Sequence, residues 1–251
     1  MSTIERKKKE DKTLLAITDF SKSSTNAILF AADIFKDFSI RFKLLNVFEN
    51  PDDEGLMLIS IGDILSKKSE DSLKNQSAEI ASILKEKNLD ISTYSASGKL
   101  KKIIGRLAQS EDINLIVTGI PANKYPCKEP NNTPLLFMGQ SRHPVLMVPE
   151  NCSSKTVNNI LILNLDAHLP ENKIDISFER MINHDHINKT IITLNEKNMD
   201  NEKISSIYTS LKENHADMLV VVSSVGDKLD RALLDYQIQE LCPTTASLLN
   251  C

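Results

Sequence analysis

Short apolar runs alternate with amphipathic segments along residues 13–149. Thr13 to Thr18 is an apolar run that stops at Asp-Phe-Ser, as is typical of a central parallel strand covered on both faces. The next segment repeats apolar residues every three or four positions from Ala27 to Phe38, which predicts a helix capped by Ser23 or Ser24. Strands alternating with helices in this way favour βαβ crossovers and a parallel sheet.

The same periodicities predict the remaining elements of this half. We expect strands at 42–47, 91–97, 114–118 and 144–149, and helices at about 70–88 and around 100–108. Residues 48–68 have no regular period and are expected to form an irregular insertion. A polar stretch at 151–157 is typical of a linker.

The pattern begins again after this linker. Residues 161–166 echo 14–19, residues 216–221 echo 113–118, and Pro243 echoes Pro144. The interval between the Asp and Pro landmarks is shorter in the second copy, and the shortening falls between a strand at 190–194 and a helix at 202–214. We therefore predict an α/β protein of two tandem open parallel-sheet units. A tail at 1–12 precedes units at 13–150 and 158–251, and the second unit lacks its middle helix and third strand.

The last strand of the first unit, 144–148, is expected at a sheet edge, where an uncovered apolar strand invites association. The echoing segment at 244–249 is the partner available within the chain. We predict that the two pair antiparallel and form an internal pseudo-dimer. A homodimer of whole chains is the other arrangement left open.

Composition narrows the class of protein. The chain is 41% hydrophobic and 25% charged, as ordinary globular proteins are, and its core must be mainly aliphatic because aromatic residues make up only 5%. A net charge of −4 with interspersed signs argues against nucleic-acid binding. No apolar stretch approaches the length of a membrane span, and the N-terminus has no apolar signal core. With four scattered cysteines, we expect a cytoplasmic protein that binds neither nucleic acid nor membrane.

Motifs for metal binding or catalysis are weak. His184 and His186 flank Asp185, but no further Cys or His pattern supports a metal site. The sequence has no P-loop, no Gly-x-Ser-x-Gly and no convincing pair of nucleophile and base. We therefore expect neither a metal nor an enzymatic activity.

A candidate ligand site lies where the predicted parallel strands end. Open parallel sheets bind ligands at the carboxyl ends of their strands, near the point where the strand order reverses. Thr18, Asp19, Val47 and Gly119 fall at such ends, and the loop after Gly119 leads to a helix N-terminus, which favours anions. Asp19 has a second interpretation, because it could satisfy backbone N–H groups at the strand-to-helix turn without any ligand.

Three segments of the chain resemble the universal stress protein family. They read LLAITDFS at 14–21, INLIVTG at 113–119 and HPVLMVP at 143–149. The resemblance covers 13–149 well, and 158–250 chiefly through Asp166 and Pro243. It implies a Rossmann-like parallel sheet of order 3-2-1-4-5 and dimerisation through the last strand. In the ATP-binding members it also implies a loop of Gly, two residues, Gly, nine residues and Gly-Ser/Thr.

Carried onto this chain, that loop keeps its spacing but loses two glycines. Gly119 matches the first glycine, Ala122 and Asn132 replace the second and third, and Thr133 supplies the hydroxyl. Glycines let a backbone approach phosphate closely, and Pro134 removes one N–H donor. The resemblance places Asp19 near adenosine and Val47 on the adenine side. With Thr18, these residues form a degenerate nucleotide pocket.

We expect a non-catalytic stress-response or regulatory protein that acts through unidentified protein partners or a small ligand, with no cofactor. The alternative is an ATP-binding, slowly hydrolysing switch in which Asp19, Gly119, Asn132 and Thr133 contact the nucleotide. An enzyme of the wider adenine-nucleotide hydrolase group is a third hypothesis.

Overall fold

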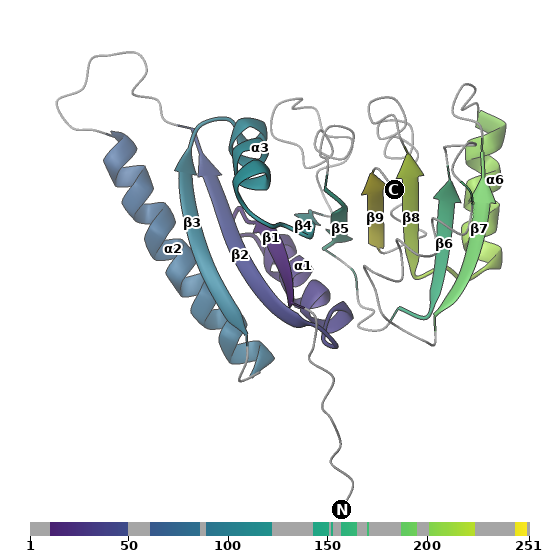
Figure 1. Ribbon diagram of the computed structural model, residues 1–251, viewed down its shortest axis with the longest axis horizontal. Helices are drawn as coiled ribbons and strands as arrows, with labels where there is room; N and C mark the ends of the chain where they lie inside the picture. The colour runs from purple at the N-terminus through teal and green to yellow at the C-terminus, as the bar shows by residue number, and fades with distance from the viewer. Residues whose placement is uncertain are drawn as a thin grey trace, which may run out of the picture.

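The computed structural model describes residues 11–49, 61–85, 89–121, 143–150, 152, 157–164, 170, 187–194, 201–223 and 244–249. Within this part of the chain, nine strands form one sheet in the order β3-β2-β1-β4-β5-β9-β8-β6-β7 (Figure 1). The predicted unit limits of 13–150 and 158–251 stay a prediction, because the two halves share this continuous sheet.

The elements follow the chain from one half to the other. The first half contains β1 (Asp11–Ile17), α1 (Lys22–Ile34), β2 (Ser39–Phe48), α2 (Ile61–Leu84), β3 (Asp90–Ser97), α3 (Leu100–Ser110), β4 (Leu115–Ile120) and β5 (Val145–Pro149). The second contains β6 (Asn159–Asn164), β7 (Asn188–Thr193), α6 (Asn201–Glu213), β8 (Met218–Ser223) and β9 (Thr244–Leu249).

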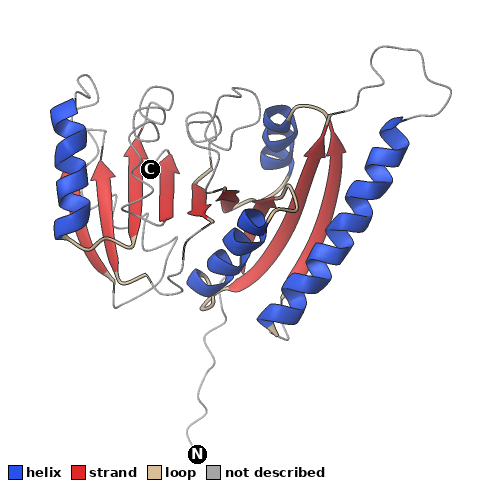
Figure 2. Ribbon diagram, turned by 180° about the vertical axis from the view of Figure 1, so that it is seen from behind, coloured by secondary structure: helices blue, strands red, loops and turns tan. Residues whose placement is uncertain are grey.

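The first half is an open parallel sheet of order 3-2-1-4-5, which confirms the predicted fold class. Helices cover both faces of this sheet (Figure 2). Ile28 of α1 and Leu73 of α2 join one apolar cluster with Leu14 of β1, while Ile104 of α3 joins a second cluster with Leu15. Neighbouring residues of β1 thus face opposite layers, and both are fully buried. This burial explains why β1 reads as a continuous apolar run.

The second half is a smaller parallel sheet in which β7, β6, β8 and β9 lie side by side. β7 ends at Thr193, and the next described element along the chain is α6, which begins at Asn201. β6 has β7 and β8 as neighbours, as β1 has β2 and β4 in the first half. The counterpart of β3 is missing from the described sheet.

The two halves meet where β5 pairs antiparallel with β9, as expected for 144–148 and 244–249. The paired residues run from Val145 with Ser247 to Met147 with Thr245. One apolar cluster extends across this junction, from Val148 in the first half to Ile160 and Val220 in the second. The halves therefore share both a sheet and a core.

Two local predictions were wrong. Helix α2 begins at Ile61, inside the segment expected to be irregular, and ends at Leu84. Its buried face combines apolar Leu73 and Ile80 with polar Ser69 and Gln76, so the apolar stripe is interrupted.

Helix α1 is capped by Ser21, not by Ser23 or Ser24. The Ser21 hydroxyl accepts a hydrogen bond from the Ser24 N–H at 3.3 Å. Ser23 and Ser24 lie within the first turn and are buried.

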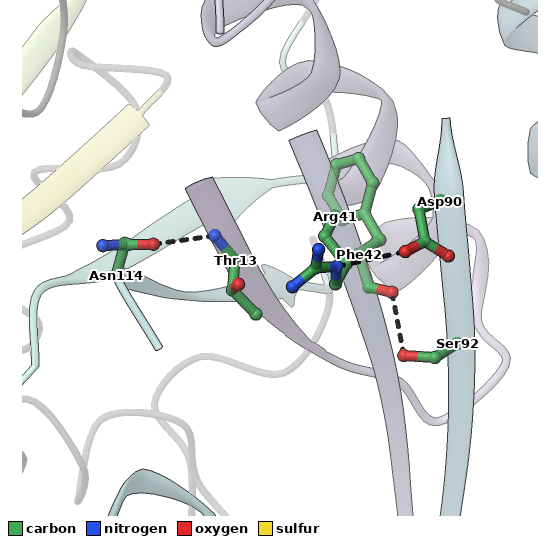
Figure 3. Close-up of polar contacts among 6 residues, drawn as sticks. All are labelled: Thr13, Arg41, Phe42, Asp90, Ser92 and Asn114. Carbon is green, nitrogen blue, oxygen red and sulfur yellow. Dashed lines mark hydrogen bonds and ion pairs between the residues drawn. The ribbon is translucent and has the colours of Figure 1, made fainter. Parts of the chain in front are cut away.

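The same pair of hydrogen bonds recurs in the two halves, near the starts of their central strands β1 and β6. In the first, the Thr13 N–H donates to Asn114 Oδ1 at 2.7 Å, and the Asn114 N–H donates to the Thr13 carbonyl at 2.9 Å (Figure 3). In the second, Asp217 Oδ2 accepts from the Asn159 N–H at 3.0 Å, and the Asp217 N–H donates to the Asn159 carbonyl at 2.8 Å. Asn114 and Asp217 are corresponding residues of the sequence echo.

Polar contacts also join β2 to the edge strand β3. Arg41 Nε lies 3.1 Å from Asp90 Oδ2, and the Ser92 hydroxyl donates to the Phe42 carbonyl at 3.3 Å (Figure 3). The Arg41–Asp90 pair is solvent-exposed, so its contribution to stability is small.

We predict that residues 156–251 do not fold alone. Ile160, Met218 and Val220 belong to a core that continues into the first half, and β9 would lose β5 as its neighbour. A small fragment also buries proportionally less surface. The fragment should be aggregated or non-cooperative in urea denaturation followed by circular dichroism. A soluble fragment with a cooperative transition would contradict this.

Candidate functional site

Four of the six predicted site residues lie at the carboxyl edge of the first half. Thr18 and Asp19 follow β1, Val47 is near the end of β2, and Gly119 is near the end of β4. β1 pairs with both β2 and β4, so these positions are neighbours where the strand order reverses. Asn132 and Thr133 lie outside the described residues, as do Ala122 and Pro134.

Thr18 is buried, and its hydroxyl holds the surrounding structure. The hydroxyl donates to Gln76 Oε1 at 2.9 Å, accepts from the Phe20 N–H at 2.9 Å, and lies 3.0 Å from the Ser24 hydroxyl. Its side chain is part of the interior, with 3% of the residue exposed. Thr18 therefore stabilises the edge from within.

Asp19 is exposed, and its carboxylate forms a turn. Oδ1 accepts a hydrogen bond from the Ser21 N–H at 3.0 Å. Partial shielding from water would raise the pKa of Asp19, but hydrogen bonds from Ser21, the Asp19 backbone and Ser24 together hold this pKa below its ordinary value of 3.8. The carboxylate thus stays ionised at neutral pH.

The turn also places Phe20 in an unusual conformation that the sequence analysis missed. Its φ angle is 64°, in the left-handed region that a bulky residue rarely adopts. The residue is 37% exposed at the carboxyl edge. Such conformations persist where the surrounding contacts determine them, and here the Phe20 N–H is held by Thr18.

Gly119 allows α1 to pack against β4. A Cβ atom at this position would overlap the Ser23 carbonyl group and lie 2.6 Å from the Ser24 nitrogen. The first turn of α1 thus crosses the end of β4 at close range. This close approach requires a glycine whether or not a phosphate binds nearby.

Val47 is partly buried and packs against the apolar cluster on the α3 face, as does Ile17. Its Cα partner on β3 is Ala96. The Val47 side chain thus contributes to the interior at the end of β2.

Behind the edge lies a network of polar side chains that the sequence analysis also missed. The Asn46 amide donates to the Thr18 carbonyl at 2.7 Å and accepts from the Ser69 hydroxyl at 2.8 Å. The Ser95 hydroxyl donates to Ser69 at 2.7 Å. Ser69 and Gln76 alternate with Leu73 and Ile80 at helical spacing, which is the one sequence signal that could have revealed it.

Among the residues that the structure describes, no group of three or more His, Cys, Asp or Glu side chains could hold a metal ion. The motif around His184 and His186 lies outside them. In the same part of the chain, no helix is long and apolar enough to cross a membrane.

The universal stress protein family matches residues 11–124. This segment is a universal stress protein domain. The match includes the whole of β1 to β4 and ends at residue 124, which lies outside the described residues. No curated protein matches the chain in sequence.

Two solved structures, both of universal stress proteins, share the fold over nearly the whole chain. One from Archaeoglobus fulgidus DSM 4304 has a TM-score of 0.59 and 12% identity, over 95% of this chain and 96% of that chain. A putative one from Pseudomonas aeruginosa UCBPP-PA14 has a TM-score of 0.52 and 12% identity, over 95% and 93%. A third, solved in complex with cAMP, has a TM-score of 0.42 and 16% identity, over 55% and 96%.

We predict that Gly119→Ala destabilises this universal stress domain by about 1–3 kcal/mol, because the added methyl group meets rigid backbone of α1. Urea denaturation would measure the loss. Gly105→Ala in α3 is the matched control, since its Cβ would have no neighbour within 4 Å. That change should be neutral or stabilise by about 0.5–1 kcal/mol. Equal effects of the two changes would contradict the assigned packing role.

Asp19 should make folding stability depend on acid pH. Because its pKa is lowered in the folded state, its ionised form adds stability at higher pH, which is lost as pH falls below 3.8 through the folded value. Asp19→Asn keeps an oxygen acceptor but has no charge to lose. The stability advantage of wild type over this variant should therefore shrink on acidification. A constant difference in urea midpoint from pH 6 to pH 3 would contradict this.

Proposed function

We propose that this protein is a non-catalytic stress-response protein of the universal stress type, which acts by binding a protein partner or a small ligand. The observation that carries this proposal is how Thr18 and Gly119 are used at the carboxyl edge. The Thr18 hydroxyl is engaged within the interior, and Gly119 is needed for helix packing. Both residues have a sufficient structural reason to be present without a nucleotide.

The loop sequence supports the same proposal. Ala122 and Asn132 stand where ATP-binding relatives have glycines, and Pro134 lacks an N–H donor. A hydrogen bond to a charged group contributes roughly 1.5–3 kcal/mol, so one lost donor weakens binding by about ten-fold to a hundred-fold. We infer that the domain has little affinity for ATP.

The pairing of β5 with β9 supports a role as an internal pseudo-dimer. Each half offers its last strand to the other, as two separate subunits would. This arrangement leaves protein partners to bind surfaces other than the β5 edge.

The alternative is an ATP-binding, slowly hydrolysing switch, and one observation favours it. The Asp19 carboxylate is exposed at the carboxyl edge of β1, with a pKa that keeps it charged. Val47 and Gly119 are in the neighbouring strands. These residues would bind the nucleoside side of the ligand, with Asn132 and Thr133 toward the phosphates.

Calorimetric titration with MgATP separates the two proposals. The wild-type protein should show no saturable heat at near-millimolar nucleotide. The variant Ala122→Gly, Asn132→Gly, Pro134→Val should regain affinity, and adding Asp19→Ala should remove it again. Micromolar binding by wild type would reject the first proposal and favour the switch. Phosphate release by wild type above the buffer rate would reject a non-catalytic role.

A further inference from the structure

The amide of Gln76 bridges three elements beneath the carboxyl edge. Its Oε1 accepts from the Thr18 hydroxyl at 2.9 Å, and its Nε2 donates to the Thr25 hydroxyl at 2.9 Å. Gln76 belongs to α2, Thr18 follows β1 and Thr25 belongs to α1. Only 5% of Gln76 is exposed, so water does not readily replace these partners.

The contact with Gln76 sets the direction of the Thr18 hydroxyl. A hydroxyl has one proton to donate, and an amide oxygen can only accept. With that proton directed to Gln76, the lone pairs of Thr18 are free to accept from the Phe20 N–H at 2.9 Å. The bond to Phe20 closes the turn in which Phe20 has a φ of 64°.

This turn also orients the exposed residues Asp19 and Phe20 at the carboxyl edge. It lies between the end of β1 and the Ser21 cap of α1, and it directs Asp19 Oδ1 to the Ser21 N–H at 3.0 Å. We propose that Gln76 is a positioning residue for Asp19 and Phe20, which couples α2 to the carboxyl edge where a ligand would bind. The inference goes beyond the proposed function, because it holds whichever ligand or partner that edge receives.

Nuclear magnetic resonance of the full chain tests the proposal without a ligand. Gln76→Met has a similar volume but neither polar atom, so Thr18 is no longer held. The Phe20 amide should then exchange with solvent roughly five- to ten-fold faster, as expected for one lost hydrogen bond. Its HN–Hα coupling and the Asp19 and Ser21 amide shifts should change with it. Asn75→Met, at the exposed neighbouring position of α2, is the matched control and should leave all of them unchanged.

A second pair of variants tests the same step from the other side. Thr18→Val keeps the branched shape without the hydroxyl and should reproduce the effect of Gln76→Met. Thr18→Ser keeps the hydroxyl and should preserve the wild-type Phe20 and Asp19 signals. Folded Gln76→Met or Thr18→Val protein with an unchanged Phe20 amide would overturn the proposal. Loss of folding in both, while Thr18→Ser and Asn75→Met fold, would show a purely structural role and overturn it too.

Discussion

An open parallel sheet has edge strands whose backbone groups need partners, and this protein covers an apolar edge from within its own chain. β5 is buried, and β9 pairs with it antiparallel, with Val145 opposite Ser247. Burial removes water from the backbone of such a strand, so each N–H and C=O must be paired. Because β9 meets this need, one apolar cluster extends from Val148 to Ile160, and the two halves share it.

The carboxyl edge of the first half has a comparable dependence on buried polar contacts. Thr18, Asn46 and Gln76 replace apolar packing by hydrogen bonds beneath the turn that begins α1. Such networks rigidify a structure when every member is satisfied, and they are costly when one member is removed. The turn at Asp19 is thus held by buried contacts even though Asp19 and Phe20 themselves are exposed.

The sequence was informative wherever burial was apolar and regular. The runs that became β1, β4 and β5 predicted the parallel sheet, and the echo at 244–249 indicated which strand would meet β5. The start of α2 was not predictable in this way, because the first buried residue of this helix is the polar Ser69. The spacing of apolar residues predicts which positions are buried among apolar side chains, but it does not predict buried polar positions.

For four residues of the candidate site, the sequence predicted their place in the fold but not their contacts within it. Thr18, Asp19, Val47 and Gly119 do lie at one edge, since strand ends follow from the strands themselves. The packing of Gly119 against Ser23 and the left-handed conformation of Phe20 depend on contacts between distant segments. No local pattern in a single sequence encodes such contacts. A glycine required for helix packing therefore cannot be told, from sequence alone, from a glycine required for phosphate binding.

Joining both halves in one chain has a consequence for how the molecule can diverge. In a symmetric dimer every substitution is made twice, so a change that suits one subunit must also suit the other. Here Asn114 and Asp217 form corresponding hydrogen bonds with different side chains. On the side away from β6, β7 has no described neighbour, whereas the corresponding strand β2 pairs with β3. Each half can therefore change its sequence without imposing the same change on the other.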